Sequence, residues 1–249
     1  MSEPNSFVSD LFSLEAKRVL LTGASSGLGR QFAPTLARAG AHVILAARGV
    51  DKMREVAAGI ESFGGSAEVV ALDVRSREAI RACVAELEAV GPLDVLINNA
   101  GIAVVKAPQN LTDDDWDAVY ETNLRGAWVL AQALIKRRLG DGRECSIVNI
   151  ASVLGLRGIG HVAPYAAAKA GLMNVGRDLS TDLAKNGIRI NAIAPGYIET
   201  EMNQDWLKTD GGERLRKKIP ARRFGVTRDL DGALLYLASD ASRYTNGTV

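Results

Sequence analysis

Short apolar segments alternate with longer helical stretches along most of this chain. The predicted strands are Arg18–Leu21, His42–Ala46, Ala67–Leu72, Val95–Ile97, Ser146–Ile150 and Arg189–Ile193. The predicted helices between them are Arg30–Ala39, Lys52–Ser62, Arg77–Ala89, Asp114–Lys136 and Tyr165–Lys185. Strands that alternate with helices form βαβ units. We therefore expect an α/β fold, a doubly wound parallel sheet with helices on both faces.

The domain organisation follows from length and composition. With 249 residues the chain suits one large α/β domain or two small ones. No Pro/Ser-rich linker, low-complexity tract or repeat divides it, so we expect a single domain over residues 1–249. The stretch at about 198–220 is polar and charged and contains Gly211-Gly212, which predicts a lid-like excursion over a site. Thr248 and Val249 would begin a further strand.

The charge balance argues against several classes of partner. The chain carries 30 Lys and Arg against 29 Asp and Glu, a formal net charge of +1. Such a balance provides no strong field for nucleic acid or for an anionic membrane surface. One basic cluster, Lys136-Arg137-Arg138, ends a helical stretch, where we expect solvated side chains that compensate the helix dipole. We therefore predict no nucleic-acid partner and no membrane partner.

Cysteine and histidine usage argues against a metal site. Cys83 and Cys145 lie in different predicted elements, and the chain has only two histidines. We expect two reduced, packed thiols and no bound metal. The first ten residues lack the basic and apolar regions of a signal peptide, and no apolar run approaches the ~20 residues of a spanning helix. These features predict a cytoplasmic protein.

A glycine-rich segment follows the first predicted strand. It reads Thr22-Gly23-Ala24-Ser25-Ser26-Gly27-Leu28-Gly29 and opens a helix. Glycines let a backbone turn tightly and approach a pyrophosphate, while the helix N-terminus adds free N–H groups and a favourable dipole. Three glycines in seven residues also suit a plain tight turn. The position after the first strand, with Ser25 and Ser26 available to phosphate, favours a dinucleotide site.

The ends of the second and third strands address the adenosine half of such a ligand. Ala47 is followed by Arg48, where a carboxylate would instead accept from both ribose hydroxyls of NAD. A guanidinium pairs with a phosphate dianion, so Arg48 favours NADP over NAD; a solvated surface arginine is the alternative. Asp73 and Val74 are candidates for holding the adenine edge, and Asp73 also suits an N-cap of the next helix.

Two residues with proton-transfer chemistry share one face of a predicted helix. Tyr165 and Lys169 lie four residues apart, the spacing that brings side chains together on a helix. A free tyrosine has a pKa of about 10, and an adjacent ammonium favours the phenolate. Surface pairs of this spacing are common, but the surrounding alanines make an exposed role less natural here. We predict that the pair handles a proton.

Further polar residues are predicted at the same edge of the sheet. Ser152 follows the fifth strand, where its hydroxyl can donate to a developing alkoxide. Asn98-Asn99-Ala100-Gly101 leaves the fourth strand, and Asn123 lies within the next helix. Each of these also suits a cap, a turn or a satisfied core group. Their joint arrival at one edge predicts an active site.

Together these features resemble the short-chain dehydrogenase/reductase family. The resemblance covers essentially the whole chain, from Ser13 to Gly247. The motifs that carry it are Thr22-Gly23-x3-Gly27-x-Gly29, Asn98-Asn99-Ala100-Gly101, Asn123, Ser152, Tyr165-x3-Lys169 and Pro195-Gly196. The resemblance implies a Rossmann-type single domain that oxidises or reduces a substrate with a nicotinamide dinucleotide.

Residue roles follow from the resemblance. It implies a catalytic tetrad of Asn123, Ser152, Tyr165 and Lys169. The tyrosine exchanges the substrate proton and the serine orients the carbonyl oxygen. The lysine holds the nicotinamide ribose and lowers the pKa of the tyrosine, while the asparagine keeps a water in the proton relay. The full set of predicted cofactor-binding residues is Gly23, Ser25, Ser26, Gly27, Leu28, Gly29, Arg48, Asp73, Val74, Asn99, Ala100, Gly101, Tyr165, Lys169, Pro195, Gly196, Ile198 and Thr200.

The sequence thus predicts an NADP(H)-dependent oxidoreductase that moves a hydride between nicotinamide and a ketone or secondary alcohol. The alternative within the family is an NAD-dependent alcohol, sugar or steroid dehydrogenase. The alternative outside enzymology is a non-catalytic dinucleotide-binding sensor on the same fold. Family members usually assemble through two long helices, here Asp114–Lys136 and Tyr165–Lys185, which implies a homodimer or homotetramer.

Within the family the chain resembles the 3-oxoacyl-acyl-carrier-protein reductase group. The segments Pro195–Met202 and Ile219–Gly225 carry this likeness, and Lys136–Arg138 would be candidates for docking a carrier protein. Asn186 stands where carrier-using reductases tend to place an arginine, which argues against a carrier. The residues expected to give the substrate pocket its apolar character are Val153, Leu154, Met202 and Trp206.

Overall fold

The structure, a computed structural model, describes residues 4–201 and 203–249. It contains a six-stranded sheet of order β3-β2-β1-β4-β5-β6 in which every neighbouring pair is parallel. The strands are β1 (Arg18–Thr22), β2 (His42–Ala47), β3 (Ser66–Ala71), β4 (Val95–Asn98), β5 (Cys145–Ile150) and β6 (Ile188–Ile193). The helices are α1 (Pro4–Phe12), α2 (Gly27–Arg38), α3 (Val50–Glu61), α4 (Arg77–Val90), α5 (Asp113–Tyr120), α6 (Gly126–Asp141), α7 (Ala163–Leu183), α8 (Gln204–Leu207), α9 (Asp210–Arg216) and α10 (Asp231–Ala238). The strand order reverses between β1 and β4, which confirms the predicted doubly wound fold.

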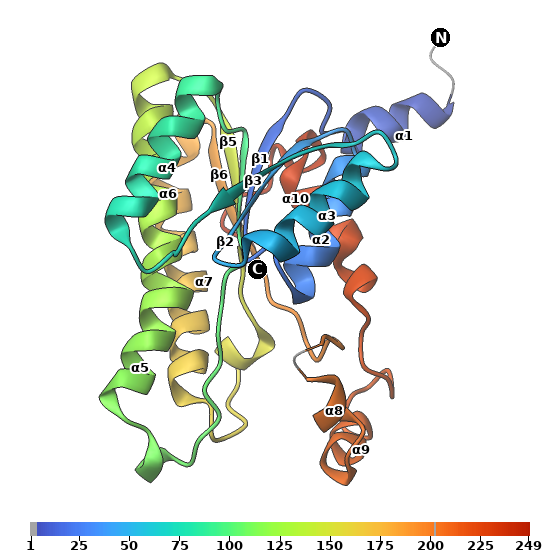
Figure 1. Ribbon diagram of the computed structural model, residues 1–249, viewed down its shortest axis with the longest axis vertical. Helices are drawn as coiled ribbons and strands as arrows, with labels where there is room; N and C mark the ends of the chain where they lie inside the picture. Colours follow the sequence, from blue (N-terminus) through green and yellow to red (C-terminus); the bar gives the residue numbers. More distant parts are fainter. Residues whose placement is uncertain (1–3, 202) are drawn as a thin grey trace.

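Helices cover both faces of the sheet (Figure 1). Helices α2, α3 and α10 pack on one face, and α4, α6 and α7 pack on the other. Alternate residues of each strand enter the two cores, so that Val19 and Leu21 of β1 lie in the first and Leu20 in the second. Because both faces are buried, the strands require continuous apolar runs. That requirement made them recognisable in the sequence.

Observed and predicted elements differ mainly at their ends. Helix α2 begins at Gly27 and not at Arg30, because the helix starts inside the glycine-rich turn. Short helices α8 and α9 lie within the excursion predicted at 198–220, and Met202, predicted in the pocket lining, lies outside the described residues. Beyond α10, Gly247 and Thr248 form backbone hydrogen bonds with β6, in keeping with the strand-like ending expected there.

The predicted helical stretch Asp114–Lys136 is confirmed, but it is not α-helical throughout. A π-helical segment, Glu121–Arg125, separates α5 from α6. At Gly126, where α6 begins, a Cβ atom would lie 2.4 Å from the backbone oxygen of Val74, so the helix passes directly over the end of the β3 strand. π-helical turns occur preferentially at functional sites, and this one contains Asn123.

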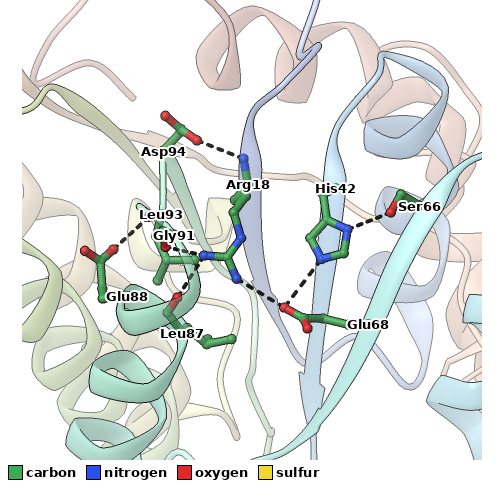
Figure 2. A network of polar contacts seen from close by, with 9 residues as sticks. All are labelled: Arg18, His42, Ser66, Glu68, Leu87, Glu88, Gly91, Leu93 and Asp94. Atoms are coloured by element: carbon green, nitrogen blue, oxygen red, sulfur yellow. Dashed lines mark hydrogen bonds and ion pairs between the residues drawn. The ribbon is translucent and has the colours of Figure 1, made fainter.

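A network of polar contacts ties together the amino-terminal edge of the sheet (Figure 2). Nη1 of Arg18, on β1, donates to the carbonyl oxygens of Leu87 (2.8 Å) and Gly91 at the end of α4. Nη2 pairs with Glu68 of β3 at 3.3 Å, and the Arg18 backbone N–H donates to Asp94 at 2.8 Å. A cation near a helix C-terminus interacts favourably with the helix dipole. Arg18 therefore fastens α4 to two strands at the edge opposite the glycine-rich turn.

Arg138, predicted to be solvated, is buried instead. Its side chain is 1% exposed and pairs with Glu88 of α4 and, at 3.3 Å, with Asp141. Glu88 also accepts the backbone N–H of Leu93 at 2.7 Å (Figure 2). The two basic residues that precede Arg138 are exposed, as predicted. The sequence pattern therefore did not predict the ion pair between Arg138 and Glu88, which joins α6 to α4 on one face of the sheet.

Replacing Glu88 with alanine should destabilise the fold strongly, because it leaves the Arg138 guanidinium buried without its main partner. We expect the free energy of unfolding to fall by about 3–5 kcal/mol in urea titrations followed by circular dichroism. Glu86→Ala, an exposed glutamate on the same helix, is the matched control and should change stability by about 0.5 kcal/mol or less. A loss below about 1 kcal/mol for Glu88→Ala would show that the pair is not a structural link.

Candidate active site

The carboxyl-terminal ends of four strands converge at one edge of the sheet. The Thr22 hydroxyl at the end of β1 accepts the backbone N–H groups of Asn99 (3.0 Å) and Ala100 (3.1 Å), which follow β4. The segments after β5 and β6 are joined by a hydrogen bond from the Val153 N–H to the Pro195 carbonyl at 2.9 Å. The four predicted exit segments therefore form one continuous rim.

The glycine-rich turn is shaped so that side chains are excluded from it. Gly23 and Gly27 adopt left-handed backbone conformations, with φ of 67° and 53°. A Cβ on Gly29 would lie 2.3 Å from the Gly23 oxygen, and one on Gly23 would lie 2.8 Å from Cα of Ala100. The turn is thus folded tightly against the segment after β4. Only glycine fits positions with this geometry.

The start of α2 has the features of a phosphate-binding terminus. Ser26 is its N-cap in extended conformation, and its side chain makes no capping hydrogen bond. A Cβ on Gly27 would meet only Thr200 Cγ2, at 3.9 Å, so the approach to the first turn is open. Unpaired N–H groups and the helix dipole then face that approach. These residues fit the pyrophosphate of a dinucleotide, the group for which the turn was predicted.

The residues predicted for the adenosine half lie beside this turn. The Leu72 N–H donates to the Ala47 carbonyl at 3.0 Å, so Arg48 and Asp73 leave neighbouring strands side by side. A Cβ on Gly49 would lie 3.8 Å from the Ser25 hydroxyl. The backbone at Arg48 therefore lies near both the glycine-rich turn and the end of β3, and its pairing with a 2′-phosphate remains a prediction.

Asp73 has a partner that sequence reasoning missed. Its carboxylate accepts hydrogen bonds from the backbone N–H and the guanidinium of Arg75, at 2.7–3.1 Å. These bonds hold the pKa of Asp73 below its ordinary value. Asp73 is not the N-cap of α4, because the Ser76 side chain accepts from the Ala79 N–H in that position. The sequence could have indicated this pairing, because Arg75 stands only two residues after Asp73.

Lys169 is buried beneath Tyr165. Its ammonium donates to the Ile150 carbonyl at 2.6 Å and lies 5.7 Å from the centre of the Tyr165 ring. Only 4% of Lys169 is exposed, and burial lowers the pKa of its ammonium from 10.5 to about 8. The last carbonyl of β5 thus fixes the position of the lysine. Tyr165 and Lys169 therefore lie on the same face of α7, as their spacing predicted.

Burial dominates the acidity of Tyr165. It raises the pKa of the tyrosine hydroxyl above its ordinary value of 10.0, and a hydrogen bond with Ser152 acts in the opposite direction. The lowering of the tyrosine pKa by Lys169, which the family resemblance implies, remains a prediction. The tyrosine is partly buried and packs against an apolar cluster formed by Val119, Leu124, Ala127, Ala168 and Leu172. Sequence spacing revealed the neighbour but not the desolvation.

Ser152 and Tyr165 are held together by close packing of two segments. The Ser152 Oγ accepts the Leu154 N–H at 3.1 Å, which leaves its proton free to donate into the site. The turn after Ser152 lies directly on α7, because a Cβ on Gly155 would lie 2.7 Å from the Ala170 backbone nitrogen. The serine hydroxyl is thereby aimed at the tyrosine.

Asn123 joins the π-helical segment to the segment after β4. Its amide accepts the Ile102 N–H and donates to the Ile102 carbonyl, both at 2.8 Å. Between them, a Cβ on Gly101 would lie 3.4 Å from Asn123 Oδ1 and 3.5 Å from Lys169 Nζ. The buried amide therefore has a structural reason to be in the helix. The water-holding role that the family resemblance implies for Asn123 remains a prediction.

The excursion after β6 passes over the glycine-rich turn. It is anchored where the Glu199 N–H donates to the Gly225 carbonyl at 2.8 Å and the Gly225 N–H donates to the Tyr197 carbonyl at 2.9 Å. Thr200 accordingly lies above Gly27. A cavity of about 470 Å³ separates the excursion from α2, and it is lined by Gly27, Arg30, Gln31, Glu199, Thr200, Glu201, Gln204, Lys208 and Thr227.

The basic cluster considered for carrier docking does not border this site. The helix that contains Asn123 and Lys136 runs away from the carboxyl edge. The thirteen residues between them correspond to a rise of about 20 Å along the helix axis. Arg138 is buried against Glu88 at the far side of the sheet. The cluster Lys136–Arg138 is therefore not placed to receive a carrier protein at the mouth of the site.

The cysteines behave as ordinary core residues. Cys83 and Cys145 are buried and unpaired, and burial raises the pKa of their thiols to about 11 and about 12. Within residues 4–201 and 203–249, no group of three His, Cys, Asp or Glu side chains is placed to hold a metal ion. In the same part of the chain, no helix is long and apolar enough to cross a membrane.

Comparison with known proteins gives one family. A family model described as short chain dehydrogenase matches residues 17–211. Gluconate 5-dehydrogenase of Gluconobacter oxydans (strain 621H) is 38% identical over 242 residues, which cover 96% of this chain and 94% of that protein. The 3-oxoacyl-acyl-carrier-protein reductase FabG of Escherichia coli (strain K12) is 35% identical over 236 residues, which cover 94% and 95%.

A solved structure agrees with these relatives. Gluconate 5-dehydrogenase from Burkholderia cenocepacia J2315, in complex with NADP and tartrate, is 36% identical. It superposes with a TM-score of 0.92 over 97% of this chain and 95% of that one. The likeness extends over the sheet, the glycine-rich turn and the carboxyl edge together. The chain therefore belongs to the short-chain dehydrogenase family, as its motifs predicted.

Proposed function

We propose that the protein is an NADP(H)-dependent oxidoreductase that interconverts a ketone and a secondary alcohol, with reduction of the carbonyl as the main direction. The observation that carries the proposal is the convergence of Ser152, Tyr165 and buried Lys169 at the carboxyl edge, beside the glycine-rich turn. The relatives support it, since FabG is named a reductase and the Burkholderia cenocepacia protein is in complex with NADP.

The residues at this edge divide the chemistry among them. The bound nicotinamide supplies or accepts the hydride. In reduction the Ser152 hydroxyl donates a hydrogen bond to the carbonyl oxygen, and Tyr165 gives that oxygen its proton. The raised pKa keeps the tyrosine protonated, as an acid must be, until the substrate arrives. The Lys169 ammonium, below its pKa of about 8, stabilises the phenolate that forms.

The cofactor is positioned by the same rim. The start of α2 with Ser25, Ser26 and Gly27 would hold the pyrophosphate, and Arg48 would pair with the adenosine 2′-phosphate. The nicotinamide end would lie along Pro195–Thr200, beside Lys169. The other residues that we propose to contact the cofactor are Gly23, Leu28, Gly29, Asp73, Val74, Asn99, Ala100 and Gly101. We infer that the excursion at 198–220 serves as a lid over this cleft.

Assembly and location complete the proposal. We propose a homodimer or homotetramer that uses the face of α5, α6 and α7. Trp116 and Tyr120 on α5 are 42% and 36% exposed, a large apolar contribution to that face. Large exposed apolar side chains of this kind mark interaction surfaces. The protein would act in the cytoplasm on a small-molecule substrate.

Activity should be found by mixing the purified protein with NADPH and ketones of the two kinds that its relatives suggest, 5-dehydrogluconate and 3-oxoacyl thioesters. Consumption of NADPH is followed by absorbance. Tyr165→Phe should lower kcat about 100- to 10,000-fold and leave the Kd for NADPH within about twofold, because only the proton donor is lost. Tyr244→Phe, a fully exposed tyrosine near the C-terminus, is the control and should retain full activity. Turnover by Tyr165→Phe at the wild-type rate would refute the mechanism.

Cofactor choice should depend on Arg48. Arg48→Ala removes a charge-assisted contact, so the Kd for NADPH should rise about 10- to 100-fold while that for NADH changes by about twofold or less. Arg54→Ala is the matched control, an exposed arginine on the following helix α3, and should leave both Kd values unchanged. Fluorescence titration measures all four constants. Equal losses for the two nucleotides would overturn the assignment of NADP.

The rate of carbonyl reduction should depend on the protonation of Lys169. Its lowered pKa means that the ammonium is present below about pH 8 and is lost as the pH rises through that value. Tyr165, with its raised pKa, stays protonated over this range. We therefore expect kcat/KM for reduction to be flat below about pH 7 and to fall above about pH 8. A profile that stays flat to pH 10 would contradict the role of Lys169.

A further inference from the structure

Arg75 forms the most extensive side-chain pairing near the proposed adenosine subsite. Its backbone N–H donates to Asp73 Oδ1 at 3.0 Å, and its Nε lies 3.1 Å from both carboxylate oxygens. Its Nη2 donates to Oδ2 at 2.7 Å. Both oxygens of Asp73 therefore face a cation. The mechanism above gives Arg75 no role.

The Asp73–Arg75 pair borders the place expected for the 2′-phosphate. Arg48 and Asp73 follow strand ends that are joined by the hydrogen bond between Leu72 and Ala47 at 3.0 Å. The charge of Arg48 also acts on Asp73, whose pKa it helps to lower. Asp73 is thus within electrostatic reach of the one cation assigned to the phosphate. The charges of both arginines therefore act on this one carboxylate.

An unneutralised carboxylate at this position would work against NADP. It would repel the dianionic 2′-phosphate and attract the Arg48 guanidinium away from it. NADH carries no 2′-phosphate and would be almost insensitive to the same charge. A residue that cancels the charge of Asp73 would therefore favour NADPH selectively. Arg75 has the required position and geometry.

We propose that Arg75 is a positioning residue that determines cofactor specificity: by pairing with both oxygens of Asp73, it neutralises that carboxylate and leaves Arg48 free for the 2′-phosphate. The proposal rests on the proposed function, because it presupposes that NADP binds at this rim. Arg75 acts through Asp73, which keeps its own contact with the adenine edge. The effect is electrostatic, so it requires the negative charge of Asp73 and not merely the shape of the turn.

The test measures Kd for NADPH and for NADH by fluorescence titration at low ionic strength. Arg75→Ala should weaken NADPH about 5- to 10-fold and NADH about twofold or less, as expected for unit charges separated by several ångströms near a protein surface. Arg77→Ala, an exposed arginine two residues further along the chain, is the matched control and should leave the NADPH/NADH ratio unchanged. The selective loss should shrink at high salt, where the charges are screened.

The variant Asp73→Asn combined with Arg75→Ala separates charge from structure. Removing the carboxylate charge should restore the NADPH/NADH ratio to within about twofold of wild type, because nothing is left to repel the phosphate. A structural role of Arg75 predicts no such restoration. Equal losses for both nucleotides in Arg75→Ala, or a double variant as unselective as the single one, would overturn the proposal.

The outcome for Arg48 tells the two proposals apart. If wild type prefers NADPH and Arg48→Ala abolishes that preference, the cofactor assignment stands whatever Arg75→Ala does. A selective effect of Arg48 without one of Arg75 would overturn only the role of Arg75. A wild-type protein that binds NADH more tightly than NADPH would overturn the cofactor assignment and the inference that rests on it.

Discussion

Burial of the parallel sheet on both faces is the constraint on which the rest of the structure depends. Helices on each side require the central strands to be mostly apolar, and the helix between successive strands lets every strand run parallel to its neighbours. All carboxyl-terminal ends then meet at one edge. Thr22 therefore contacts Asn99 there, and the segment after Ser152 contacts Pro195, although these residues are far apart in sequence.

Much of this arrangement was predictable because it follows from local patterns. Apolar runs marked the strands, and the glycine-rich segment marked a tight turn in which a Cβ on Gly23 or Gly29 would clash. The helical spacing of Tyr165 and Lys169 placed them on one face. Strand order put both beside the turn, since parallel strands share an edge. Each of these inferences uses only periodicity or sterics within a short segment.

The features that escaped prediction depend on contacts between distant segments. The π-helical segment around Asn123 directly precedes Gly126, where α6 packs closely against Val74, a contact that helical periodicity does not register. Arg138 belongs to a run of basic residues, but Glu88, fifty residues away, makes its burial tolerable. The pKa of Tyr165 rises because the tyrosine is partly buried against an apolar cluster to which α5, α6 and α7 contribute. Desolvation is a property of the assembled core, so spacing alone could not reveal it.

The account centres on a single rim that binds the nucleotide at one end and transfers the proton at the other. The most direct measurement is a crystal structure of the complex with NADPH. We predict that the 2′-phosphate lies within hydrogen-bonding distance of the Arg48 guanidinium and that the nicotinamide ribose contacts Lys169 and Tyr165. A nucleotide whose phosphate points away from Arg48, or whose nicotinamide lies away from Tyr165, would contradict the account.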